Sequence, residues 1–142
     1  MVEKQIHLLH IEDDSVDRMV VQRVLKKFPE ITSNYHARNG EEALDMLLGR
    51  NGQEMLNPSP NVILLDINMP KMNGIEFLRE IRTHESMKSK LCFVMTTSND
   101  DGDKANAYAN YAAGYIIKPV DITLFETTFR ILVDYWKLCE LI

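Results

Sequence analysis

Residues capable of phosphoryl chemistry stand directly after short apolar runs at several points of this chain. In chain order these residues are Glu12 with Asp13, Asp66, Thr96 and Lys118. Parallel strands end at the same edge of a sheet, and open α/β sheets hold their ligands at that edge. If the apolar runs are neighbouring strands, the acids, the hydroxyl and the ammonium converge on one pocket.

The grouping of acids predicts a divalent cation and a nucleophilic aspartate. Carboxylates that lie close together repel one another unless a cation neutralises them. Oxygen ligands suit Mg²⁺ or Mn²⁺, whereas zinc favours nitrogen and sulfur ligands, which do not cluster here. With a cation and the ammonium of Lys118 in place, Asp66 is able to attack a phosphoryl group and form an acyl phosphate. The hydroxyl of Thr96 is able to bond a phosphoryl oxygen.

Each of these residues also has an ordinary structural explanation. Glu12, Asp13 and Asp14 suit the amino end of a helix, where the helix dipole favours acids. Lys118 alone could be a surface lysine, and Thr96 alone carries less information still. The joint placement of acids, threonine and lysine after successive strands is much more specific, so it favours a single site.

Apolar runs of strand length alternate with segments of helical periodicity, which predicts a (βα)5 fold with a parallel five-stranded sheet. The expected strands are residues 6–11, 32–37, 62–65, 91–95 and 115–117. The second strand is polar apart from Tyr35 and Ala37, so we expect it at an edge of the sheet. The helix after the fourth strand is expected to bury the face formed by Ala105, Tyr108, Ala109 and Ala112.

The size and charge of the chain limit its class. With 142 residues, of which 45% are hydrophobic, the chain fits one domain over residues 1–142 with no output domain. A net charge of -5 and scattered basic residues argue against nucleic acid as a partner. No signal peptide and no apolar stretch near the ~20 residues of a membrane span are found, so we expect a cytoplasmic protein. Cys92 and Cys139 lack metal-type spacing and are expected as small buried hydrophobes.

Two segments are candidates for contact with partners. Residues 50–60 form a loop longer than the ~2–6 residues usual between a helix and a strand, either a tolerated insertion or a partner-contacting loop. The final helix, from about Ile122, carries two apolar stripes where core packing needs one. The stripe expected in the core is Phe125, Phe129, Leu132, Trp136 and Cys139. The stripe expected to bind a partner or a second copy, unless it is extra core, is Ile131, Tyr135, Leu138 and Ile142.

Taken together, these motifs resemble the receiver domain of two-component response regulators over essentially the whole chain. The matching segments are Ile11-Glu12-Asp13-Asp14, Leu64-Leu65-Asp66-Ile67-Asn68-Met69-Pro70 with Asn73-Gly74, Val94-Met95-Thr96-Thr97-Ser98, and Gly114-Tyr115-Ile116-Ile117-Lys118-Pro119. The resemblance implies a doubly wound, flavodoxin-like α/β sheet with strand order 2-1-3-4-5. It also implies a cis peptide bond before Pro119.

The same resemblance assigns the central roles. Asp66 is implied as the phosphoacceptor, served by a sensor histidine kinase or a histidine phosphotransfer protein. Glu12, Asp13, Asp66 and the backbone carbonyl of Asn68 are implied as the ligands of Mg²⁺, with Mn²⁺ as a possible substitute. Lys118 is implied as the partner of the phosphoryl group. Such a protein is not an enzyme, although it assists its own phosphotransfer and slow autodephosphorylation.

Signal output and reaction rate depend on further residues in this resemblance. Thr96 and Tyr115 are implied as switch residues, while Asn68, Thr97 and Ser98 flank the phosphoryl site and tune its rates. Phosphorylation is expected to repack the surface of the fourth helix, the fifth strand and the fifth helix. On that surface lie Tyr108, Tyr111, Tyr135 and Leu138, and the last helix is a possible homodimer contact.

A narrower resemblance and two alternatives complete the sequence-based interpretation. The Thr-Thr-Ser run at 96–98 and the long loop are similar to stand-alone receivers that serve bacterial phytochromes and related sensor kinases. Glu12 replaces the commoner first aspartate, and Thr97 replaces a small residue. One alternative is a phosphorylation-independent interaction module with a receiver fold. Another is a phosphohydrolase, which Asp66-Ile67-Asn68 disfavours because it lacks a second aspartate.

Overall fold

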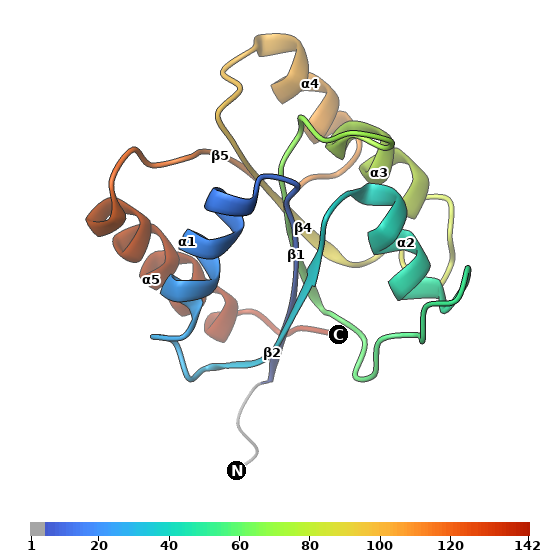
Figure 1. Cartoon of the computed structure of the whole chain (residues 1–142), viewed down its shortest axis with the longest axis horizontal. Coiled ribbons are helices and arrows are strands. Elements are labelled where there is room, and N and C mark those ends of the chain that lie inside the picture. Colours follow the sequence, from blue (N-terminus) through green and yellow to red (C-terminus); the bar gives the residue numbers. More distant parts are fainter. Residues whose placement is uncertain (1–4) are drawn as a thin grey trace.

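Five strands and five helices alternate along the chain in a computed structural model that describes residues 5–142. They are β1 (Ile6–Ile11), α1 (Ser15–Leu25), β2 (Ile31–Ala37), α2 (Gly40–Leu48), β3 (Val62–Leu65), α3 (Gly74–Ile81), β4 (Leu91–Thr96), α4 (Asp101–Ala109), β5 (Gly114–Ile117) and α5 (Ile122–Leu138) (Figure 1). All neighbouring strands pair in parallel, in the order β2-β1-β3-β4-β5. The predicted fold and strand order are therefore confirmed.

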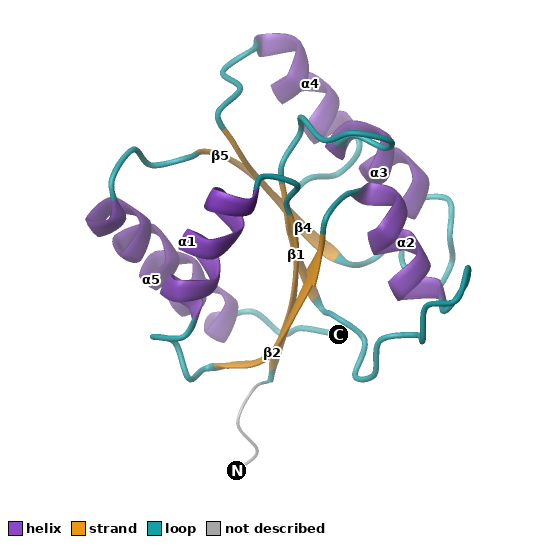
Figure 2. Cartoon of the chain, viewed as in Figure 1, coloured by secondary structure: helices purple, strands orange, loops and turns teal. Residues whose placement is uncertain are grey.

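Helices cover both faces of the sheet (Figure 2). Alternate residues of β1 serve the two faces: Ile6 and Leu8 pack with the apolar residues of α1 and α5, whereas Leu9 and Ile11 pack with those of α2 and α3. Every residue of β1 and of β3 is buried. This two-sided burial explains why these strands read as continuous apolar runs.

The second strand lies at an edge of the sheet, as predicted, and its residues alternate between half-buried and exposed over most of its length. The long loop at 50–60 packs beside this edge. Its Leu56 N–H donates to the carbonyl of Met46 at 3.0 Å, and the hydroxyl of Tyr35 donates to the carbonyl of Pro58 at 2.9 Å. The loop is thus tied to both α2 and β2.

The predicted buried face of α4 is wrong. Ala107 is its buried residue and Ala112 is buried just after it, whereas Ala105, Tyr108 and Ala109 are exposed. Alanine is small enough to suit either environment, so a run of alanines does not define the buried side of a helix. Tyr108, predicted to be buried, therefore lies on the surface.

The final helix has the two faces predicted for it. Its core stripe is buried at Phe125, Phe129, Leu132 and Trp136. Cys139 is half-buried and caps the helix, while Cys92 is fully buried. The second stripe is exposed: Ile131 64%, Tyr135 51%, Leu138 80% and Ile142 89%.

Within residues 5–142, every helix is too short or too polar to cross a lipid bilayer.

Candidate acidic site at the carboxyl edge of the sheet

Backbone hydrogen bonds continue the sheet by one residue beyond the strand ends and so fix the predicted site residues. These N–H to carbonyl bonds run from Glu12 to Ala37, from Asp66 to Ile11 and from Lys118 to Thr96, at 3.0, 3.2 and 2.8 Å. The carboxyl ends of β1, β3, β4 and β5 are in register at this edge. The structure places the predicted acids and lysine together at this edge, and Thr96 lies at the end of β4 on the same edge.

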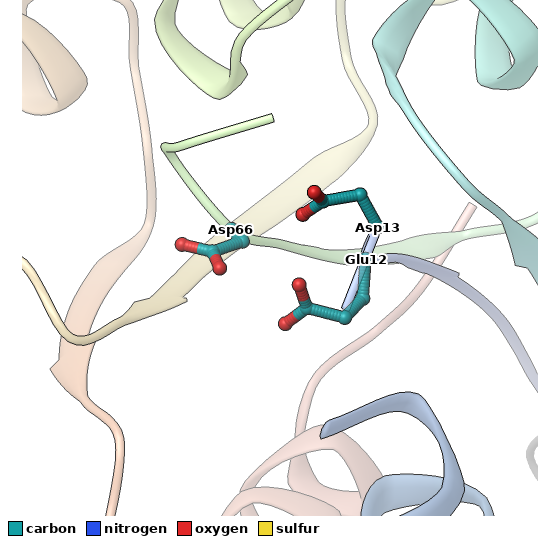
Figure 3. Close-up of side chains that lie close together, drawn as sticks. All are labelled: Glu12, Asp13 and Asp66. Atoms are coloured by element: carbon teal, nitrogen blue, oxygen red, sulfur yellow. The ribbon is translucent and has the colours of Figure 1, made fainter. Parts of the chain in front are cut away.

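Carboxylates from two strand ends form a compact group. One oxygen each of Glu12, Asp13 and Asp66 lies within 4.8 Å of the others (Figure 3). Glu12 and Asp66 are buried, at 1% and 8% exposure, while Asp13 is exposed. A set of oxygen donors that is open on one side suits Mg²⁺ or Mn²⁺, which retain water ligands. These three residues therefore fit the predicted cation.

The ammonium of Lys118 bridges this group to α1. Its Nζ donates to Glu12 Oε1 at 2.6 Å, to Asp66 Oδ2 at 2.9 Å and to Asp17 Oδ2 at 2.8 Å. Burial alone would lower the pKa of Lys118, but the bonds to Asp17, Glu12 and Asp66 outweigh it and raise that pKa above its usual range. Lys118 is therefore a permanent cation.

Burial of the Glu12 carboxyl favours its protonated form. Desolvation raises the pKa of Glu12 to about 7, and the nearby charge of Asp66 adds to this, although the hydrogen bond from Lys118 opposes it. One ammonium faces more carboxylates than it can neutralise. The pocket accordingly favours a further positive charge, either a proton or a metal ion.

Close packing of the turn between β3 and α3 fixes Asp66. Its Oδ1 accepts from the N–H of Ile67 at 2.6 Å, so with Lys118 on Oδ2 both oxygens are held. Asn73 caps α3 in a reciprocal capping box with Glu76. A Cβ on Gly74 would lie 2.2 Å from the carbonyl oxygen of Asp66, so only glycine allows this approach.

Ser98 connects the two predicted switch residues. Its N–H donates to Thr96 Oγ1 at 3.2 Å, and its carbonyl accepts from the hydroxyl of Tyr115 at 2.9 Å. Burial raises the pKa of Tyr115, so the phenol stays a donor. The Ser98 hydroxyl donates to Asp103 Oδ2 on α4 at 2.6 Å, while Thr97 is exposed. The resemblance to receiver domains implied Thr96 and Tyr115 as switch residues but gave no sign of this backbone link.

The predicted cis bond before Pro119 is wrong. In the stretch from residue 5 to residue 142, the cis peptide bond is Asn57–Pro58. The backbone of Lys118 is already bonded to Thr96, and its side chain reaches Glu12 and Asp66 from a trans peptide.

Two further residues are relevant to the site, and only one of them was predicted from the sequence. Asn68, predicted to supply a carbonyl ligand, is exposed two positions beyond Asp66, and its part in metal binding stays a prediction. Asp17, which contacts Lys118, was not predicted as a site residue. Its only sequence signal is its place in the first turn of the helix that follows Glu12 and Asp13.

Fold and site together define a flavodoxin-like α/β protein whose carboxylates, lysine and threonine share the carboxyl edge of the sheet. The family model of the response regulator receiver domain matches residues 8–130. The chain belongs to the response regulator receiver family.

Known relatives agree with this assignment. The response regulator Rcp1 of Synechocystis sp. is 34% identical over 111 residues, which cover 78% of this chain and 75% of Rcp1. The structure of the phosphorylated cyanobacterial phytochrome response regulator RcpA gives a TM-score of 0.83 at 25% identity and covers 99% of each chain. A two-component response regulator from Legionella pneumophila gives 0.74 at 41% identity, covering 89% of this chain and 97% of its own.

The Mn(2+)-bound form of Rcp1 also matches, with a TM-score of 0.83 at 28% identity over 96% of this chain and 99% of that one. The match to the phytochrome response regulator RcpA confirms the narrower resemblance. In each of these matches the likeness extends well beyond the short motifs, because most of both chains is covered.

Proposed function

We propose that this chain is a stand-alone, cytoplasmic response regulator that accepts a phosphoryl group on Asp66 from a sensor histidine kinase or a histidine phosphotransfer protein. The observation that carries the proposal is the contact of Lys118 Nζ with both Glu12 and Asp66, beside a cluster of carboxylates. A lysine held against the acceptor carboxylate can neutralise the negative charge of an incoming phosphoryl group.

In the proposed reaction, an oxygen of Asp66 attacks phosphorus as the bond between phosphorus and the donor breaks. The ammonium of Lys118, 2.9 Å from Asp66 Oδ2, donates to a phosphoryl oxygen. The buried hydroxyl of Thr96 is available at the same edge to donate to another. Mg²⁺, or Mn²⁺ in its place, held by Glu12, Asp13, Asp66 and the carbonyl of Asn68, would neutralise charge during transfer.

Acetyl phosphate with Mg²⁺ should add one phosphoryl group to the wild-type protein, detected by intact mass, and Asp66→Asn should abolish the gain. The amide is a poor nucleophile but keeps the size of the side chain, so folding is preserved. Chelation of Mg²⁺ should also prevent the gain. Equal uptake by Asp66→Asn would place the phosphoryl group elsewhere. No uptake by the wild type would instead favour a phosphorylation-independent interaction module.

Binding of Mg²⁺ should weaken as the pH falls. Because desolvation raises the pKa of Glu12 to about 7, this carboxyl holds a proton below that pH, and the cation must displace it. Affinity is full above this pKa and falls by about tenfold from pH 8 to pH 6. Titration calorimetry at the two pH values measures the change. Glu12→Gln should bind Mg²⁺ more weakly with a flatter profile, and a flat wild-type profile would contradict the raised pKa.

The conformational effect of phosphorylation is proposed to reach partners through the surface of α4, β5 and α5. Thr96 and Tyr115 already share Ser98 as a hydrogen-bonding neighbour, so a movement of Thr96 toward the phosphoryl group reaches Tyr115. Couplings between sites are typically ~1–3 kcal/mol. The side chains proposed to read this change are exposed: Tyr108, Tyr111, Tyr135 and Leu138.

The exposed stripe of α5 is proposed as the contact for a partner or a second copy of the chain. Ile131→Glu should weaken that association by about tenfold, because it places a charge in an apolar interface. Sedimentation over a range of concentrations, with and without beryllofluoride, gives the mass. Met19→Glu, which replaces an exposed apolar residue of α1, is the matched control. A strict monomer under all conditions would exclude the homodimer.

Autodephosphorylation is proposed to be slow but finite. Asn68 is exposed, small and polar, so it leaves a path for water toward Asp66, whereas Thr97, also exposed, adds bulk beside the site. Ser98, the third residue proposed to tune this rate, has its hydroxyl bonded to Asp103. Its influence would therefore depend on the position of α4.

A further inference from the structure

Lys118 has a third anionic partner that lies outside the carboxylate cluster. Asp17 Oδ2 accepts from Lys118 Nζ at 2.8 Å, as close as Glu12 and Asp66. Asp17 comes from the first turn of α1, and its side chain is 38% exposed, against 8% for Lys118. The lysine is thus held from the solvent side as well as from the strand ends.

This contact fills the hydrogen-bonding capacity of the ammonium. A lysine has three N–H donors and no acceptor, and each donor of Lys118 has a different carboxylate partner. A phosphoryl oxygen on Asp66 needs one of these donors. It therefore competes with Asp17 for the ammonium, in addition to replacing the Asp66 oxygen.

The position of Asp17 is set by the start of α1. Asp14 caps this helix, and its Oδ1 accepts from the N–H of Asp17 at 2.9 Å. The backbone of Asp17 is therefore anchored in the first turn of α1, and its carboxylate contacts Lys118.

We propose that Asp17 is a positioning residue that restrains the Lys118 ammonium and thereby slows phosphoryl transfer to Asp66. The inference rests on the proposed function of Asp66. Neutralising Asp17 weakens its hold on one N–H of Lys118, which then becomes available to the phosphoryl group. Asp17 acts through Lys118, so its effect requires that lysine.

Asp17→Asn should raise the rate of phosphorylation by acetyl phosphate and Mg²⁺ by about threefold to fivefold, the range of a partly exposed ion pair. Asp101→Asn is the control, since it removes the same charge from an exposed first-turn aspartate of α4. In a Lys118→Met background, the Asp17→Asn effect should disappear. An unchanged rate for Asp17→Asn, or an equal increase in the Lys118→Met background, overturns the inference.

A second measurement needs neither metal nor phosphate. The ammonium resonance of Lys118 in a nitrogen-15 NMR spectrum reports its hydrogen bonds, and its protons should exchange faster with water in Asp17→Asn but not in Asp101→Asn. Asp17→Glu should restore slow exchange in part. Unchanged exchange in Asp17→Asn overturns the contact. A wild-type protein that takes up no phosphoryl group overturns the proposed function and with it this inference, whereas normal uptake with an unaltered Asp17→Asn rate overturns this inference alone.

Discussion

Trp136→Ala should lower the free energy of unfolding by about 3–5 kcal/mol, the usual cost of truncating a buried tryptophan. Trp136 is fully buried and heads the largest buried side chains of the described residues. It lies on the inner stripe of α5, with its ring 5.7 Å from that of Phe93 on β4. The substitution would leave a cavity between the longest helix and the centre of the sheet. Urea denaturation followed by circular dichroism measures the loss without relying on tryptophan fluorescence.

Two matched variants separate cavity formation from other effects. Trp136→Phe keeps most of the side-chain volume. It also breaks no hydrogen bond, because no acceptor among residues 5–142 bonds the indole Nε1–H. Trp136→Phe should therefore lose clearly less stability than Trp136→Ala. Ile131→Ala removes an exposed residue of the same helix and should change stability by less than about 1 kcal/mol. If Trp136→Ala were no worse than Ile131→Ala, α5 would not depend on its inner stripe.

The site could be predicted from sequence because its residues are anchored to strand ends. A buried parallel strand is a short apolar run, and the residue that follows it lies at the edge of the sheet. Glu12, Asp66 and Lys118 each follow such a run, and one backbone bond beyond the strand ties each to its neighbour. Once the order of the strands is known, the convergence of these residues can be predicted.

Features that depend on helix orientation could not be predicted in the same way. Asp17 reaches Lys118 only because α1 is oriented so that its first turn faces the strand ends, and periodicity alone does not give that rotation. The same limit explains the error at α4, where alanines lie on both the exposed and the buried side. The link through Ser98 uses backbone atoms, which every residue type has.

Gly74→Ala should cost about 3 kcal/mol or more of stability, at or beyond the upper end of ordinary overpacking. The new Cβ would lie 2.2 Å from the carbonyl oxygen of Asp66 and 3.0 Å from the Cα of Ile67, and backbone atoms cannot move aside as a flexible side chain can. The turn is also tied by the Gly74 N–H, which donates to the carbonyl of Ile67 at 2.8 Å. Either α3 or the end of β3 must shift.

That shift should also reach the chemistry, because it displaces the residue proposed to take the phosphoryl group. A misplacement of about 1 Å is able to slow a reaction on the order of 10²-fold, so the folded fraction of Gly74→Ala should phosphorylate far more slowly than the wild type. Gly52→Ala is the control: its φ of +84° adds backbone strain, but no atom lies within 4 Å of the new Cβ. It should lose about 1 kcal/mol of stability and keep its phosphorylation rate. Wild-type stability and rate in Gly74→Ala would mean that the turn can retreat from Asp66, and close packing would then not be what holds the acceptor in place.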